Sequence, residues 1–209
     1  DLSSLMEEIA RADIGIWPDY AVTVEREIYY RKGASYLSYE EWNQRCTAAH
    51  KELFDEVRQD LEDLHEWVAE HFEANVYEDI YSPFCLIAKH EEEANRIHHH
   101  LQEYIETIPN LTVVRNDVYA RFSHVDFNKG TALGEIMRIE GITPDQVVVA
   151  GDHHNDLPMM DHLYAHRLIA PSNAIPEIQE KVNRLNGYIS HQLAGHGVAR
   201  GLEFFCFGF

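Results

Sequence analysis

The chain contains 209 residues, of which 45% are hydrophobic, and it carries a formal net charge of −19 from 36 acidic and 17 basic side chains. This length allows one sizeable hydrophobic core, or one core with a smaller companion domain. The hydrophobic fraction is ordinary for a globular protein and excludes extensive disorder. Nucleic acid and anionic membrane surfaces would be repelled by the acidic excess, so we expect neither as a partner.

The cysteines and histidines give little sign of zinc or disulfide chemistry. Cys46, Cys85 and Cys206 are far apart and odd in number, which suggests neither a disulfide framework nor a zinc site and favours a reducing compartment. Three histidines at positions 98–100 lie in a helical stretch and favour a solvated helix face over a metal site. The chain has no apolar run of 18 residues and no visible targeting signal, so we expect a cytoplasmic protein.

The first elements predict a helix followed by a hairpin. Apolar residues at three- and four-residue spacing indicate a helix over residues 2–9. Residues 20–24 then read as a buried strand, and residues 27–30 as a second strand or hairpin arm that turns at Gly33.

The middle of the chain alternates helix and strand. Residues 39–74 lack glycine and proline and carry an apolar stripe at helical period, which predicts one long helix or two nearly collinear ones. The further predicted elements are a strand at 83–88, a helix at 91–105, and strands at 112–114 and 118–122. This alternation is typical of a compact α+β module.

The last third reads as an α/β domain. Residues 146–150 are continuously apolar and rich in β-branched side chains, which fits a strand buried on both faces of a parallel sheet. The elements predicted around it are a helix at 129–139, a helix containing Leu157, Met159 and Met160, a strand at 167–170, a helix at 175–185, a strand at 187–189, and a helix at 198–205. The pattern predicts a doubly wound, Rossmann-like fold.

The run Gly-Asp-His-His-Asn-Asp at residues 151–156 directly follows the buried strand. Ligands bind outside the carboxyl ends of strands in open parallel sheets, and magnesium prefers carboxylate and amide oxygens. Asp152 could instead only cap the following helix, as aspartate often does. The presence of Asn155 and Asp156 favours a magnesium half-site, whereas His153 and His154 are expected to be exposed.

Lys129 begins the helix that precedes this strand, within Lys-Gly-Thr-Ala-Leu. A lysine is locally unfavourable there, because the helix dipole favours an anion at the N-terminus. A phosphate bound by the lysine and the helix end would explain its position. The alternative is an ordinary surface lysine, and the Gly-Asp run about two dozen residues later favours the phosphate hypothesis.

These motifs together resemble the haloacid-dehalogenase (HAD) superfamily. The resemblance covers residues 128–198 and lies in the type IIB branch, whose Cof-like and sucrose-phosphate-phosphatase-like enzymes carry a large α+β cap. Lys129 matches the family's third motif and residues 151–156 its fourth. Residues 172–174 and 195–198 are similar to the Asn-Ala and Gly-Val steps of the family.

The start of the chain is similar to the strand that follows the second family motif. There the family usually has Asn-Gly before a hairpin, whereas this chain has Glu25-Arg26. The resemblance implies a HAD core at residues 1–27 and 121–209 and an inserted cap at residues 28–120. The cap would cover the site and select the substrate.

The resemblance implies a magnesium-dependent phosphatase that acts on a small phosphorylated metabolite such as a sugar phosphate. An aspartate of the family attacks phosphorus and forms an aspartyl-phosphate, and a second aspartate serves as general acid and base. Asp152 would bind magnesium, and Asp156 would do so directly or through water. Asn155 would orient the loop or the phosphate, and Lys129 would neutralise the phosphate and the nucleophile.

The first family motif, Asp-x-Asp, does not occur in the sequence. We therefore expect a fragment of a longer protein that lacks the nucleophile strand and about forty residues at its start, and no turnover from this chain alone. The alternative is a catalytically inactive HAD fold that binds a phosphorylated ligand or a protein. A further alternative is a P-type ATPase or phosphotransferase relative, and the lack of transmembrane segments in the sequence argues against the ATPase.

The aromatic residues of the cap segment are open to two interpretations. Trp42, Tyr77 and Tyr81 could stack on a sugar, but aromatic side chains in such a module more often belong to its core.

Overall fold

The computed structural model describes residues 1–13, 15–58 and 61–208. In chain order its elements are α1 (Leu2–Ala12), β1 (Tyr20–Thr23), β2 (Glu27–Lys32), β3 (Ser35–Ser38), α2 (Glu40–Val57), α3 (Leu61–His71), β4 (Ala74–Tyr77), β5 (Cys85–Ala88), α4 (Glu91–Ile105), β6 (Leu111–Asn116), β7 (Tyr119–His124), α5 (Lys129–Glu140), η1 (Pro144–Gln146), β8 (Val148–Ala150), η2 (His154–Asp156), β9 (Arg167–Ala170), α6 (Pro176–Arg184), β10 (Tyr188–Ile189) and α7 (Ala194–Phe207). No helix among these residues combines the length and apolar character that a membrane crossing needs.

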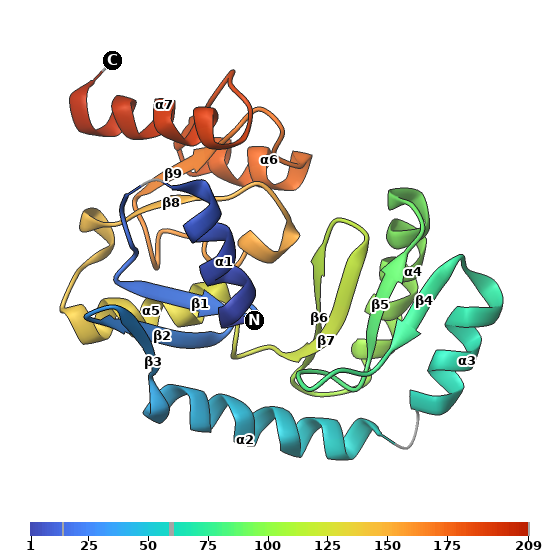
Figure 1. The fold of residues 1–209 in the computed structure, drawn as a ribbon. Coiled ribbons are helices and arrows are strands. Elements are labelled where there is room, and N and C mark those ends of the chain that lie inside the picture. Colours follow the sequence, from blue (N-terminus) through green and yellow to red (C-terminus); the bar gives the residue numbers. More distant parts are fainter. Residues whose placement is uncertain (14, 59–60, 209) are drawn as a thin grey trace.

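Figure 1 shows two groups of elements joined by α2, which runs beneath both. One group holds the elements of both chain ends, from α1 to β3 and from α5 to α7. The other holds α3, α4 and the strands β4 to β7. The predicted limits of core and cap, residues 28 and 120, stay a prediction.

The parallel sheet has the order β10-β9-β8 and is covered on both faces. Ile169 of β9 lies against Gly201 of α7, where an added Cβ would approach its side chain to 2.5 Å. The neighbouring Leu168 and Ala170 pack instead with Ile178 of α6. Because successive residues of a strand face opposite ways, α6 and α7 cover opposite faces. The doubly wound α/β fold predicted from the sequence is confirmed.

The antiparallel sheet β1-β2-β3 is fastened to α2 by one side chain. The backbone N–H of Ile28 donates to Asn43 Oδ1 at 2.8 Å, and Asn43 Nδ2 donates back to the Ile28 carbonyl at 2.8 Å. Trp42 is buried beside this contact and donates from Nε1 to the carbonyl of Arg26 at 2.7 Å. Trp42 is therefore a core residue, as the second interpretation of the aromatic residues expects.

The remaining sheet has the antiparallel order β4-β5-β7-β6. Its buried face packs on α3 and α4 in one cluster, whose fully buried members include Val68, Phe84, Ile97, Leu101 and Phe122. The α+β character predicted for the middle of the chain is confirmed.

Two of the predicted elements are wrong. Residues 39–74 form two helices, and Figure 1 shows α3 turning away from the line of α2 instead of continuing it. The segment with Leu157 and Met160 is not a helix but the short η2 followed by turns. Asp156 binds backbone N–H groups of this loop through its side chain, and Pro158 has no N–H to give, so helical bonding does not develop.

Candidate active site

The Gly-Asp loop begins where β8 ends. The N–H of Gly151 still donates to the Ile169 carbonyl at 3.2 Å, so Asp152 is the first residue beyond the parallel ladder. A Cβ at Gly151 would lie 2.6 Å from Cβ of Asp156, a distance that side-chain atoms do not adopt. Glycine at this position therefore lets the loop fold back onto the strand end.

Asp156 holds the loop closed. Its Oδ2 accepts from the backbone N–H groups of Asp152 at 2.9 Å and His153 at 3.2 Å. Its Oδ1 accepts from Lys129 Nζ at 2.6 Å. The residue is only 6% exposed, and a buried carboxylate needs such donors. Both oxygens of Asp156 thus accept hydrogen bonds, one from the loop backbone and one from Lys129 of α5.

Lys129 reaches the loop from the first turn of α5. Asn128 caps this helix by accepting from the N–H groups of Gly130 and Thr131. A Cβ at Gly130 would lie 2.4 Å from the Pro158 carbonyl oxygen, so glycine permits the close approach of helix and loop. The two predicted motifs therefore meet through a direct ion pair in which the Lys129 side chain is 30% exposed.

Asp152 has one engaged and one open carboxylate oxygen. Oδ2 accepts from Asn173 Nδ2 at 3.0 Å, and Asn173 Oδ1 accepts from the N–H of Ala194 at 2.6 Å. Oδ1 has no hydrogen-bond partner among the described residues. Sequence reasoning did not select Asn173 as a site residue, although its position after β9, the strand beside β8, is the signal that could have done so.

Magnesium fits this donor set with Asp152 as the protein ligand. Among residues 1–13, 15–58 and 61–208 no group of three or more His, Cys, Asp or Glu side chains is placed to hold a metal. Magnesium in phosphate sites uses one or two carboxylates and takes its other ligands from phosphate and water. The open Oδ1 of Asp152 meets this requirement, whereas Asp156 would first have to release a donor.

The Asn155 side chain points from the Gly-Asp loop towards the β1–β2 hairpin. Its Nδ2 lies 3.5 Å from Glu25 Oε1, and Glu25 also pairs with Arg121 of β7. Neither Glu25 nor Arg121 was selected from the sequence as a site residue. The one signal in the sequence was that Glu25-Arg26 stands before the hairpin where the family usually has Asn-Gly.

The two loop histidines are half-buried, so the expectation that they are exposed is wrong. The turn between β6 and β7 covers them, and the N–H of Asp117 lies 3.1 Å from His153 Nε2. Burial, with Arg115 next in effect, lowers the pKa of His154. His154 therefore stays neutral near pH 7.

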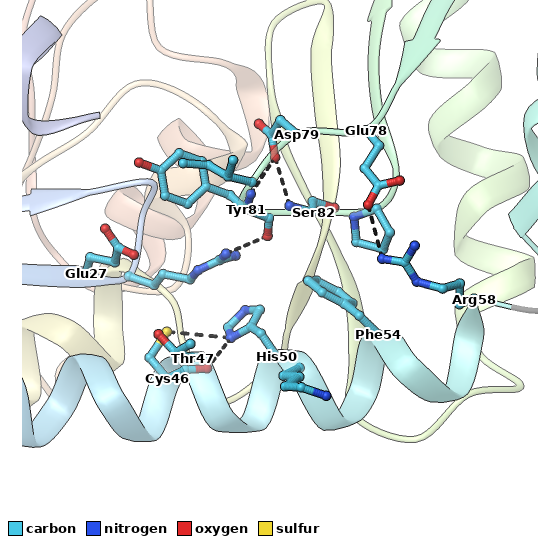
Figure 2. A pocket seen from close by; sticks show the side chains of 14 residues that line it. Glu27, Cys46, Thr47, His50, Phe54, Arg58, Glu78, Asp79, Tyr81 and Ser82 are labelled. Carbon is cyan, nitrogen blue, oxygen red and sulfur yellow. Dashed lines mark hydrogen bonds and ion pairs between the residues drawn. The ribbon is translucent and has the colours of Figure 1, made fainter.

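One cavity lies beside the loop, and another lies beside α2. One of about 260 Å³ is lined by Glu25, Asn128 and Asn155 on one side and by residues of α4 and β6 on the other. A second of about 360 Å³ lies between α2 and residues 78–83. Figure 2 shows His50 and Phe54 of α2 below Tyr81 and Ser82 in this second cavity. Tyr81 is half-buried there, and Tyr77 lines neither cavity.

Comparison with known proteins gives one family match. The model of the haloacid dehalogenase-like hydrolase family matches residues 11–202. A putative phosphatase, YxeH of Bacillus subtilis, is 30% identical over 109 residues, which is 49% of this chain and 38% of that relative. The match thus spans well under two thirds of the relative's length.

Two solved structures share the fold at low sequence identity. The sucrose-phosphatase of Synechocystis, in complex with sucrose and phosphate, gives a TM-score of 0.67 at 16% identity and covers 98% of this chain and 81% of that one. The haloacid dehalogenase-like hydrolase yhjK of Bacillus subtilis gives 0.58 at 17% identity and covers 100% and 75%. At such identities the likeness concerns the fold.

Proposed function

Because the chain belongs to the haloacid dehalogenase-like hydrolase family, we propose that it carries the phosphate and magnesium site of a phosphomonoester hydrolase. The observation that supports this most is the convergence of Lys129, Asp156 and Asp152 at the carboxyl end of β8. A cation, a free carboxylate oxygen and a helix N-terminus then face the place where ligands bind in such sheets.

Each residue of the site has a role in this proposal. Asp152 would bind magnesium through Oδ1, and magnesium when bound would neutralise charge on the transferring phosphoryl group. Lys129 would bind the phosphate as a point charge. Asp156 would hold Lys129 and the loop in place, with direct or water-mediated metal binding as its further predicted role. Asn155 would orient the loop or the phosphate.

A small phosphorylated metabolite such as a sugar phosphate is the proposed substrate. The cavity of about 260 Å³ beside Asn155 is lined by amide, hydroxyl and imidazole groups, by the charged side chains of Glu25 and Arg115, and by apolar side chains, which suits a small polar leaving group. The sucrose and phosphate named for the Synechocystis relative suggest the same class. The sheet β4 to β7 with α3 and α4 would act as the cap and select the substrate.

The test is a panel of phosphate esters assayed with magnesium and with a chelator. The attacking aspartate of the family belongs to an Asp-x-Asp pair that residues 1–209 do not contain, so the assay compares this chain with the whole open reading frame that encodes it. Asp152→Asn should lower turnover in the active protein by at least a hundredfold, because the metal loses its protein ligand.

Asp55→Asn is the matched control, since Asp55 lies on α2 with its side chain 60% exposed and, among the described residues, pairs only with Lys51. It should leave turnover within twofold of wild type. Turnover that survives both chelation and Asp152→Asn would reject the metal assignment. Phosphate binding without turnover in every form of the protein would favour the inactive binding module instead.

A further inference from the structure

The turn between β1 and β2 has an unfavourable backbone conformation. Val24 and Glu25 both have positive φ, 45° and 61°, although neither is glycine. Side chains with a Cβ avoid this left-handed region, and a β-branched valine does so most strongly. Such conformations persist only where the surrounding contacts enforce them.

The Glu25 carboxylate is the contact that this turn delivers. Its side chain is 19% exposed and pairs through Oε2 with Arg121 Nη2 of β7. Its other oxygen, Oε1, lies 3.5 Å from Asn155 Nδ2 of the Gly-Asp loop. The Glu25 carboxylate thus contacts both β7, in the sheet β4-β5-β7-β6, and the loop that contains Asp152.

Arg121 depends on this carboxylate. The arginine side chain is only 5% exposed, and its Nε has no partner among the described residues. Burial lowers the pKa of the guanidinium, but the charge of Glu25, its hydrogen bond and the charges of Tyr119 and Asp79 together outweigh this, so the net shift is upward. Removing one partner of a buried ion pair leaves the other charge uncompensated, which is strongly unfavourable.

A second contact joins the same sheet to the same loop. The N–H of Asp117, in the turn from β6 to β7, lies 3.1 Å from His153 Nε2. The turn before β7 therefore reaches the segment 153–155 directly, and Arg121 within β7 is linked to it through Glu25. A movement of this sheet would therefore change the contact between Glu25 and the Asn155 amide.

We propose that Glu25 is a positioning residue that couples β7, through Arg121, to Asn155 at the phosphate site. Glu25 sets the orientation of the Asn155 amide when the sheet lies over the loop, and it releases the amide when the sheet moves away. The coupling rests on the proposed function only for its effect on turnover. The physical link between the two segments stands on the contacts alone.

The first test measures the link without any activity. Hydrogen exchange of the backbone amides at residues 151–157 is compared in wild type and Glu25→Gln, which keeps the shape of the side chain but removes its charge. Exchange in this loop should rise at least fivefold in Glu25→Gln. In the control Glu73→Gln, which breaks an ion pair with Lys89 whose partners are both 61% exposed, it should stay within twofold.

The second test separates coupling from a purely structural role of the turn. The protein encoded by the whole open reading frame is assayed with p-nitrophenyl phosphate as Glu25→Gln, as Asn155→Ala and as the double variant. Coupling predicts a tenfold or larger fall in kcat with KM within threefold for Glu25→Gln, and no further fall in the double variant. Val24→Gly relieves the same turn but keeps the carboxylate, and it should retain kcat within twofold.

Four outcomes decide between these possibilities. Additive effects of Glu25→Gln and Asn155→Ala, or unchanged exchange at 151–157 in Glu25→Gln, would overturn the proposal. A fall in kcat with Val24→Gly as large as that with Glu25→Gln would also overturn it, because the turn itself would then be the cause. A wild-type protein without phosphatase activity but with the predicted exchange would reject the proposed function and leave the coupling supported.

Discussion

At the scale of single residues, Arg26 and His50 are buried and form no ion pair with any of the described residues. Arg26 is 4% exposed, and burial lowers the pKa of its guanidinium. It donates to Ser123 Oγ at 3.2 Å and to the Tyr81 carbonyl at 2.7 Å. His50 continues the network, since its Nε2 lies 3.1 Å from Ser123 Oγ and accepts from the N–H of His124 at 3.0 Å. His50 therefore carries its proton on Nδ1, which donates to the Cys46 carbonyl.

We predict that His50 makes the protein sensitive to acid. Burial, with the charge of Arg26 next in effect, lowers its pKa to about 3. The unfolded chain binds a proton near pH 6.5 while the native protein does not, so stability is complete above that pH and falls as pH drops towards 3. The loss is at most about 1.4 kcal/mol for each pH unit in this window.

Urea unfolding between pH 7 and pH 4 measures this effect. His50→Gln should be less stable at pH 7, because the amide replaces the imidazole imperfectly, but it should lose less stability on acidification than wild type. His99→Gln is the control, since the His99 side chain is 83% exposed. Equal pH slopes for wild type and His50→Gln would contradict the assignment.

At the scale of elements, the Asn43 side chain takes the place of a backbone hydrogen-bonding partner. Its amide offers one acceptor and one donor to Ile28, in the same way as a neighbouring strand would. Nδ2 also lies 3.0 Å from Ser38 Oγ of β3. The helix α2 leads from the sheet β1-β2-β3 to the sheet β4-β5-β7-β6, and these hydrogen bonds hold its first turn in place.

Asn43→Ala should lower the free energy of unfolding by about 2–3 kcal/mol, because the N–H of the fully buried Ile28 loses its only acceptor among the described residues. Chemical unfolding measures this change. Gln44→Ala, at an exposed position of the same helix, should change stability by less than about 0.5 kcal/mol. A loss below about 1 kcal/mol for Asn43→Ala would show that water replaces the amide.

The elements that follow a simple period were predictable from the sequence. The helix predicted at 91–105 is α4, which has these bounds, begins with three glutamates and buries Ala94, Ile97 and Leu101. The apolar run at 146–150 contains β8. The strand β4 was not predicted, because its four residues directly follow a helical stripe and carry only a half-buried, irregular pattern.

The candidate site was predictable only in the parts that lie on local motifs. Lys129 and the loop at 151–156 follow from a helix start and a strand end, and the structure joins them by an ion pair. Asn173, Glu25 and Arg121 reach the loop from a second strand, a hairpin and the antiparallel sheet. Such partners are determined by tertiary packing, which no single stretch of sequence encodes.

At the scale of the whole molecule, stability depends both on the net charge of −19 and on ligand binding at the candidate site. Self-repulsion destabilises a compact state of high net charge, and salt screens it over about 10 Å at 0.1 M. Any cation should therefore raise the thermal midpoint to some extent. A divalent cation bound at Asp152 would stabilise the folded state further, because a ligand that binds only the native state shifts the unfolding equilibrium by mass action.

The two effects separate when ionic strength is held constant. With sodium chloride replaced in part by magnesium chloride and inorganic phosphate, each ligand at about a hundredfold over its dissociation constant should add about 2.7 kcal/mol, so even one of them should raise the thermal midpoint by about 5–11 °C. Asp152→Asn should abolish this rise but keep the response to sodium chloride, since the rest of the surface charge is unchanged. Asp55→Asn should keep both responses. If Asp152→Asn and wild type gain equally from magnesium and phosphate, the stabilisation is general screening and the ligands do not act at the carboxyl end of β8.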